Sequence, residues 1–295
     1  MSERSPKNLP ASIRQKLSDL ARARKDDFGL ILVKYGLERI LYRLTRSAHH
    51  DAFVLKGALL FELWTHDTYR PTRDADFLGR GDNAPERLVR LFRELCEMEV
   101  EPDGLVFDAD SVRAERITED ADYEGVRVSF IARLDRARIP IQIDIGFGDA
   151  VTPAPVESDY PTLLPAPHPR LLVYPKETEL GANTRMKDFY DLEVPARTFE
   201  FEGELLAKAI RTTFANRATE LPAKGIALAF TPEFHDDQSK NRQWKAFCSR
   251  IPTDTNPTDF KSVVEALKLF LSPVAAAAWE ETAFATKWKP GGPWQ

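Results

Sequence analysis

Apolar residues recur at helical spacing over the first part of the chain. Residues 11–24 and 28–45 place them three or four positions apart, which predicts two amphipathic helices. A short apolar run at residues 53–55 precedes a third helical pattern at residues 58–65, and a fourth follows at residues 85–98. The first ten residues lack this pattern, so we expect them to be disordered.

Three segments have the character of strands: residues 75–78, 126–134 and 139–147. In the last of them Gln142 and Asp144 alternate with isoleucines, so the polar side chains lie on one face and the apolar ones on the other. Helices and strands are mixed along this part of the chain. The pattern therefore predicts an α+β fold built on a mixed sheet.

The pattern changes after residue 149. The stretch 151–169 contains six prolines and almost no periodicity, which predicts an extended connection. Helices are then expected at residues 188–197, 204–216, 243–250, 259–271 and 273–284. The tail KWKPGGPWQ is expected to interrupt regular structure. We therefore predict three parts, which are N-terminal helices at 1–48, a sheet-containing core at 49–170 and a helical domain at 171–295.

Composition limits the partners that the chain can have. Its 295 residues carry a net charge of −5, so there is no overall basic field for coating nucleic acid, although a local basic patch remains possible. Cys96 and Cys248 lie far apart and in no metal-ligand spacing, which fits a reducing cytoplasm without disulfide or zinc. We find no apolar signal segment and no run near eighteen apolar residues. A cytoplasmic protein that does not span a membrane is expected.

The stretch RPTRDADFLGRGD, residues 70–82, places Asp74 and Asp76 two positions apart. At the start of a strand, both carboxylates face the same side of the sheet. Two acids held this closely repel each other unless a cation lies between them. Mg²⁺ is the usual cation, because it binds one or two carboxylates together with the phosphates of a substrate.

A third carboxylate is supplied by Asp144. Three aspartates on adjacent strands are what a two-metal site for phosphoryl transfer needs. Each part alone has an ordinary explanation, since Asp-x-Asp pairs are common at strand ends and Asp144 can stand at a loop edge before Gly146. The order of the parts favours a site. Gly57 opens a helix after a short strand, the Asp-x-Asp pair follows one helix later, and the lone aspartate comes on a later strand.

This order resembles the nucleotidyltransferase core, in which Gly-[Gly/Ser], a helix, Asp-x-[Asp/Glu] and a strand with a third carboxylate follow one another. Here the second position of the Gly-Ser pair is Ala58, so one hydroxyl contact to phosphate is missing. The stretches FVLKGALLFELW, RPTRDADFL and RMKDFYDL together resemble the AbiEii/AbiGii family of nucleotidyltransferase toxins, with its MenT-like members. The resemblance implies a nucleotidyltransferase-like core followed by a helical C-terminal domain.

The resemblance also implies roles for individual residues. Asp74 and Asp76 would be the catalytic, metal-binding pair, joined by Asp144 as a metal ligand. The nucleotide-binding residues would be Lys56, Gly57, Thr72 and Arg73, and Thr72 stands where some antitoxins modify their toxins. The catalytic motif R-x-K-D-x-x-D would be supplied by Lys187, Asp188 and Asp191. On a helix these three share a face, and the ordinary explanation for that spacing is a solvated face with salt bridges.

For the whole chain, the resemblance implies a toxin of a toxin–antitoxin system. It would use Mg²⁺ and transfer nucleotides from an NTP to RNA, at the acceptor end of tRNA, and a cognate AbiEi-type antitoxin would be encoded nearby. A nucleotidyltransferase that modifies small antibiotics would share the metal triad, but the RMKDFYDL motif speaks against that class.

One feature departs from the family. Members normally carry a helix with an active-site lysine before the RMKDFYDL motif, whereas here residues 178–184 are too few for it and contain no lysine. Lys176 and Lys187 flank this gap, and either is a candidate substitute. Two functional classes therefore stay open: an active transferase, and a catalytically weakened or inactive homologue that retains the fold together with antitoxin and nucleotide binding.

Overall fold

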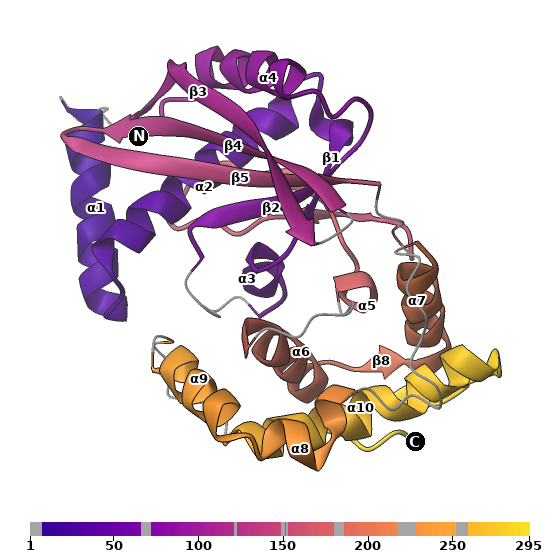
Figure 1. The fold of residues 1–295 in the computed structure, drawn as a ribbon. Helices are drawn as coiled ribbons and strands as arrows, with labels where there is room; N and C mark the ends of the chain where they lie inside the picture. Colours follow the sequence, from indigo (N-terminus) through magenta and orange to yellow (C-terminus); the bar gives the residue numbers. More distant parts are fainter. Residues whose placement is uncertain are drawn as a thin grey trace. The chain divides into compact units, whose positions relative to one another are not determined.

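A computed structural model describes residues 8–65, 72–120, 123–148, 151, 153–179, 186–216, 228–249, 251 and 259–295 (Figure 1). The chain forms two compact units. The first comprises Met1–Gly148 and Val156–Val173, and the second comprises Asp149–Pro155 and Tyr174–Gln295. The predicted division into three parts stays a prediction.

The helices of the first unit lie where the apolar spacing predicts them. They are α1 (Leu9–Arg24), α2 (Phe28–Arg46), the 3-10 turn η1 (His50–Ala52), α3 (Leu59–Thr65) and α4 (Pro85–Glu97). Asn8 caps α1 and Asp27 caps α2, because each side chain accepts a hydrogen bond from a backbone N–H of the first turn. The expected disorder of the first ten residues is wrong for Leu9 and Pro10, which begin α1, and residues 1–7 lie outside the described residues.

A seven-stranded sheet forms the centre of this unit, in the order β3-β4-β5-β2-β1-β7-β6. The strands are β1 (Phe53–Lys56), β2 (Asp74–Gly79), β3 (Leu105–Asp120), β4 (Tyr123–Leu134), β5 (Ala137–Phe147), β6 (Val156–Asp159) and β7 (Arg170–Val173). β2 pairs with β5 and β1 with β7 in parallel, whereas the other pairs are antiparallel. The prediction of a mixed sheet in an α+β fold is confirmed.

One face of the sheet is apolar and is covered by α2 and α4. The isoleucines of β5 are at most 1% exposed, and a Cβ at Gly36 of α2 would come within 2.6 Å of the Ile141 side chain. Phe92 of α4 packs against Phe53 and Phe130 with ring centroids 6.2 and 6.0 Å apart. The helices therefore take up the apolar side of the alternating strands and leave the polar side to the opposite face.

Three strands of this sheet, β3, β6 and β7, were missed from the sequence. β3 lies at the edge of the sheet and is rich in charged residues, which is how exposed edge strands are commonly protected. β6 lies inside the proline-rich stretch that was expected to be only an extended connection, so that expectation is wrong for these four residues. The prolines bracket β6, at Pro155 and Pro161, and leave its own backbone N–H groups free to pair with β7.

A buried polar network fastens the segment after β6 to the helices. Both carboxylate oxygens of Glu38 accept from the Leu163 backbone N–H, at 3.0 and 3.1 Å. Lys34 forms an ion pair of 2.8 Å with Glu62, which also accepts from the Tyr160 hydroxyl at 2.9 Å. Burial raises the pKa of Glu38 to about 8, against the lowering effect of the Leu163 N–H and of Lys34.

The raised pKa makes the stability of this unit depend on pH. Glu38 binds its proton more tightly in the folded state, so its contribution is complete below about pH 4.5 and is lost as the pH rises towards 8. We expect the free energy of unfolding to fall over this range by on the order of a few kcal/mol, and to fall less in Glu38→Gln. Urea unfolding at several pH values measures this. The exposed Glu157→Gln on β6 is the control, and an unchanged slope in Glu38→Gln would contradict the assignment.

The second unit is mostly helical. Its elements are α5 (Lys176–Glu179), α6 (Met186–Thr198), β8 (Phe201–Glu202), α7 (Gly203–Asn216), η3 (Leu228–Phe230), α8 (Pro232–His235), α9 (Gln238–Cys248), α10 (Phe260–Glu280) and β9 (Lys287–Trp288). The predicted break between residues 271 and 273 is wrong, because α10 continues through Pro273. A proline removes one helical hydrogen bond, here to the carbonyl of Leu269, whose side chain is 69% exposed.

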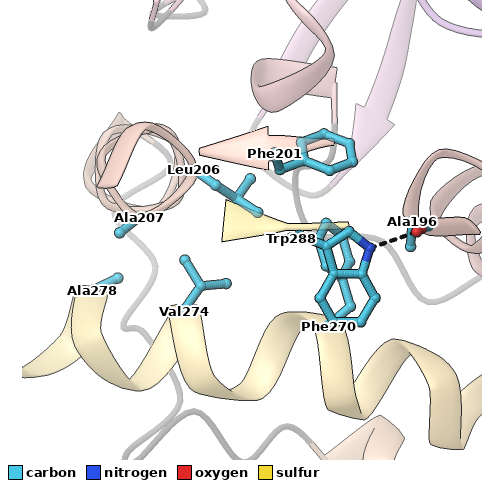
Figure 2. Close-up of a cluster of buried hydrophobic side chains, with 8 residues drawn as sticks. All are labelled: Ala196, Phe201, Leu206, Ala207, Phe270, Val274, Ala278 and Trp288. Carbon is cyan, nitrogen blue, oxygen red and sulfur yellow. Dashed lines mark hydrogen bonds between the residues drawn. The ribbon is translucent and has the colours of Figure 1, made fainter. Parts of the chain in front are cut away.

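The core of this unit gathers around Trp288, as Figure 2 shows. Its ring centroid lies 4.8 Å from that of Phe270, and its indole Nε1 donates to the Ala196 carbonyl at 2.5 Å. Trp294 packs against both Phe270 and Trp288, with ring centroids 5.8 and 5.5 Å away, and its indole donates to the Phe270 carbonyl at 2.9 Å. The expectation that the tail only interrupts regular structure is therefore wrong, since its tryptophans supply buried aromatic area and β9 pairs with β8.

Within the part of the chain that the structure describes, α10 is long and apolar enough to cross a membrane. One such helix is weak evidence for a span, because a buried core helix passes the same test. Phe270, Val274 and Ala278 of α10 all point into the aromatic core (Figure 2), which accounts for much of its apolar character.

Candidate nucleotide and metal site

Charged side chains form a row across the polar face of the sheet. In the strand register Lys56 of β1 is opposite Asp76 of β2, Asp76 is beside Asp144 of β5, Asp144 is opposite Arg127 of β4, and Arg127 is opposite Glu115 of β3. Paired residues of neighbouring strands point to the same side, about 4.8 Å apart from strand to strand. The fold thus places five charged residues, distant in sequence, side by side.

The predicted aspartate pair stands at the start of β2. Asp74 and Asp76 are half-buried on the polar face, whereas Ala75 between them is fully buried on the apolar face. The prediction that both carboxylates face one side is therefore confirmed. The Thr72 hydroxyl donates to Asp74 Oδ1 at 2.5 Å and so fixes that carboxylate, while the neighbouring Arg73 is exposed.

Gly57 gives Asp76 room. It follows β1 with a φ of +77°, and a Cβ at this position would lie 2.3 Å from Asp76 Oδ2. Such an approach excludes any side chain, so the carboxylate lies directly against the glycine backbone. The chain then turns into α3, where the Leu60 N–H donates to the Gly57 carbonyl at 3.1 Å. The glycine that the sequence pattern singles out therefore shapes the surroundings of the Asp-x-Asp pair.

Asp144 is placed beside Asp76, as the prediction of adjacent strands requires. It lies within β5 and is only 6% exposed, so the alternative of a loop-edge residue is wrong. Its two oxygens accept from Arg127 Nε and Nη2, each at 2.8 Å, and Gln142 Nε2 approaches at 3.4 Å. The hydrogen bond to Asp144 raises the pKa of Arg127, and so do the charges of Asp144, Asp74 and Glu115.

Arg127 was missed from the sequence. The alternation of apolar and polar residues in the segment 126–134 does indicate that the Arg127 side chain lies on the polar face. No signal indicated that β4 lies next to β5 in the register that sets Arg127 opposite Asp144, because antiparallel register depends on the turn between the strands. The bidentate contact of Arg127 with Asp144 therefore became visible only in the structure.

The predicted motif of Lys187, Asp188 and Asp191 lies on α6 in the second unit. Asp188 is buried and Asp191 is half-buried, so the alternative of a solvated face with salt bridges does not hold for Asp188. The side chain of Lys187 lies outside the described residues. The structure brings Asp74, Asp76 and Asp144 together in the first unit, and the catalytic role of the α6 motif stays a prediction.

Lys176 and Lys187 were predicted as candidate substitutes for the lysine that the resemblance leads us to expect. Lys176 begins the one-turn helix α5, and its ammonium donates to the Glu200 carbonyl and lies 4.7 Å from the ring centroid of Phe201. It is thus engaged by its own unit. Residues 180–185, which include most of the shortened segment, lie outside the described residues.

The donor set can be compared with what a metal ion requires. Among the described residues, no group of three or more His, Cys, Asp or Glu side chains is arranged to hold a metal ion. Mg²⁺ needs fewer protein ligands than this, because one or two carboxylates suffice when water and substrate phosphates complete its octahedral coordination. Asp74 and Asp76, on one face and next to the space that Gly57 leaves, provide such a pair. The residues therefore fit Mg²⁺ bound together with a nucleotide.

A mixed sheet with a Gly-turn, an Asp-x-Asp strand and a neighbouring aspartate strand defines a nucleotidyltransferase-type protein. The sequence model of the family "Nucleotidyl transferase AbiEii toxin, Type IV TA system" matches residues 39–266, more than three-quarters of the chain. The protein belongs to this AbiEii family of nucleotidyltransferase toxins. The resemblance inferred from the motifs is thereby confirmed.

Comparison with curated protein sequences finds no match. Two solved structures from Helicobacter pylori are similar, each at 14% identity. JHP933 has a TM-score of 0.39, with 91% of this chain and 92% of that chain covered. A proposed nucleotidyltransferase has a TM-score of 0.40, with 95% and 97% covered. Because both scores are below 0.5, the assignment to the family rests on the sequence match.

Proposed function

We propose that the protein is a toxin that transfers a nucleotidyl group from an NTP to RNA, with Mg²⁺ held by Asp74 and Asp76. The observation that carries the proposal is the placement of these two carboxylates on one face of β2, with Asp76 against the backbone of Gly57. Membership of a type IV toxin family adds an antitoxin partner and a nucleotide substrate. The acceptor end of tRNA, an AbiEi-type antitoxin and a cytoplasmic location are the specific forms that we propose.

In the proposed reaction a hydroxyl oxygen of the RNA attacks the α-phosphorus of the NTP. The bond from that phosphorus to the oxygen bridging the β-phosphate breaks, pyrophosphate leaves with the bonding electrons, and the hydroxyl proton passes to solvent or to a carboxylate. A bound Mg²⁺ would supply charge stabilisation for this transfer. Lys56, Gly57, Thr72 and Arg73 are proposed to hold the nucleotide. The α6 residues Lys187, Asp188 and Asp191 are proposed to be catalytic.

The alternative function is a weakened or inactive homologue that keeps the fold and the binding of antitoxin and nucleotide. It is favoured by the short segment 178–184 before α6, which contains no lysine and has too few residues for the lysine-bearing helix that the resemblance leads us to expect. That lysine would stabilise the departing pyrophosphate, and loss of one such donor costs about a hundredfold to a thousandfold in rate. The two functions therefore differ in rate and share their binding partners.

The test is transfer of label from each of the four α-³²P-NTPs to total tRNA by the purified chain. We expect labelled tRNA with at least one NTP, complete loss of labelling with EDTA, and its return with excess Mg²⁺. The size of the labelled RNA and nuclease mapping of its end identify the acceptor. Absence of label with every NTP, in a chain that binds NTP and Mg²⁺, would favour the inactive homologue. Labelling that persists in EDTA would contradict the metal.

A further inference from the structure

The hydrogen bonds that Asp144 accepts limit the number of metal ions that the site can hold. Both of its carboxylate oxygens accept from the fork of Arg127 at 2.8 Å, and the side chain of Asp144 is only 9% exposed. We infer that Arg127 takes the place of a second cation, so that Asp144 is the counter-ion of Arg127 and the divalent ion is held by Asp74 and Asp76 alone. This inference rests on the proposed function and deepens it.

The geometry of the pair supports this role. A guanidinium donates two parallel N–H groups, which match the two oxygens of a carboxylate and use them together. Gln142 approaches the same carboxylate from within β5, at 3.4 Å from Oδ2. These donors engage both oxygens of Asp144 in a nearly buried position, so a metal ion bound there would compete with them. We therefore expect the ion pair between Arg127 and Asp144 to persist when the divalent ion binds.

The charges of the row and of the neighbouring Asp74 agree with one divalent ion. Arg127 and Lys56 contribute two positive charges, and Asp74, Asp76, Asp144 and Glu115 contribute four negative charges, so the six groups leave a net charge of −2. A two-metal site would place two divalent ions about 3.5–4 Å apart. Beside the fixed guanidinium, a second divalent ion would meet repulsion that the remaining carboxylates do not offset.

The two roles of Asp144 give opposite results in a double variant. If Asp144 is a metal ligand, Asp144→Asn weakens metal binding whether or not Arg127 is present. If Asp144 is the counter-ion of Arg127, Asp144→Asn weakens binding only because it leaves an unpaired guanidinium near the metal. Removing Arg127 as well should then restore binding. The prediction that Asp144 ligates metal and this inference exclude each other.

The experiment measures Mn²⁺ binding by isothermal titration calorimetry, with free Mn²⁺ followed by electron paramagnetic resonance. It compares the wild-type chain with Asp144→Asn, Arg127→Met and the double variant. Arg133→Met is the matched control, since Arg133 lies on the same strand and pairs with Asp108 at 3.5 Å. Asp76→Asn removes a proposed ligand, so any Mn²⁺ that this variant still binds as tightly as the wild-type chain is bound outside the proposed site. Circular dichroism verifies that each variant is folded.

We expect one Mn²⁺ per wild-type chain and about tenfold or more weaker binding in Asp144→Asn, the size expected of one extra positive charge within several ångströms of a divalent ion. The double variant and Arg133→Met should bind within about threefold of the wild-type chain, and Arg127→Met should bind more tightly or take up a second ion. Two ions in the wild-type chain, or a double variant as weak as Asp144→Asn, would overturn the inference and leave the proposed function standing. Equal Mn²⁺ binding in Asp76→Asn and the wild-type chain would overturn the proposed metal site itself.

Discussion

Nucleotide transfer is expected to fall by on the order of a thousandfold or more when Asp76 is replaced by Asn, while the fold is kept. The change removes one negative charge at the place where the metal is proposed to bind and keeps the size of the side chain. Asp76 lies in the charged row between Lys56, which is a cation, and Asp144, whose carboxylate is engaged by Arg127, so neither register neighbour is expected to supply the lost carboxylate. The labelling assay with tRNA measures the effect.

The matched control for this prediction is Asp108→Asn. Asp108 lies on β3 of the same sheet and pairs with Arg133 at 3.5 Å, so it tests the loss of a sheet carboxylate outside the candidate site. Its activity should stay within about twofold of the wild-type chain, since exposed ion pairs contribute little. Transfer at the wild-type rate by a folded Asp76→Asn chain would rule out Asp76 as a metal ligand.

The second large effect is expected from Gly57→Ala. The added Cβ would lie 2.3 Å from Asp76 Oδ2, so the carboxylate must move by an ångström or so. A misplacement of that size costs about a hundredfold in rate. A left-handed backbone at φ +77° adds a stability cost of roughly 1–2 kcal/mol for any residue with a Cβ. We therefore expect a modest loss of stability together with a large loss of transfer.

Gly81→Ala separates these two contributions. Gly81 also has a left-handed backbone, with φ +88°, but a Cβ there would meet nothing closer than Arg87 Nη2 at 3.9 Å. It should therefore lose stability as Gly57→Ala does and keep its transfer rate. Urea unfolding and the labelling assay measure the two quantities. If both variants lose activity equally, backbone strain alone explains the effect and the contact with Asp76 has no special role.

Much of the candidate site could be predicted because it depends on local rules. Asp74 and Asp76 share a face because side chains alternate on a strand. In β5 the alternating isoleucines mark the apolar face, so the Asp144 side chain was predicted to lie on the opposite, polar face. The helices of the first unit followed from apolar spacing, and their predicted bounds agree with the observed ones to within two residues.

What could not be predicted depends on long-range pairing. The bidentate contact of Arg127 requires the register between β4 and β5, which no local pattern states. Trp288 is followed by prolines and glycines, which predicted an irregular tail. Its side chain is nevertheless buried against α10, and its backbone pairs with β8. Pro273 suggested a helix end, but packing of Phe270 and Val274 on either side of it kept α10 continuous.

The pairing of β1 with β7 has a consequence for how the protein is made. β1 ends at Lys56 and its parallel partner begins at Arg170, so the ribosome must add more than a hundred residues before that edge is covered. At ordinary rates of translation this takes on the order of ten seconds. Until then the nascent chain presents an open edge beside the strand that leads to Gly57, and Glu38 lacks the N–H of Leu163. A gene fragment that stops at Gly148 would make this unfinished state permanent, whereas one that runs to Val173 would include every strand of the sheet.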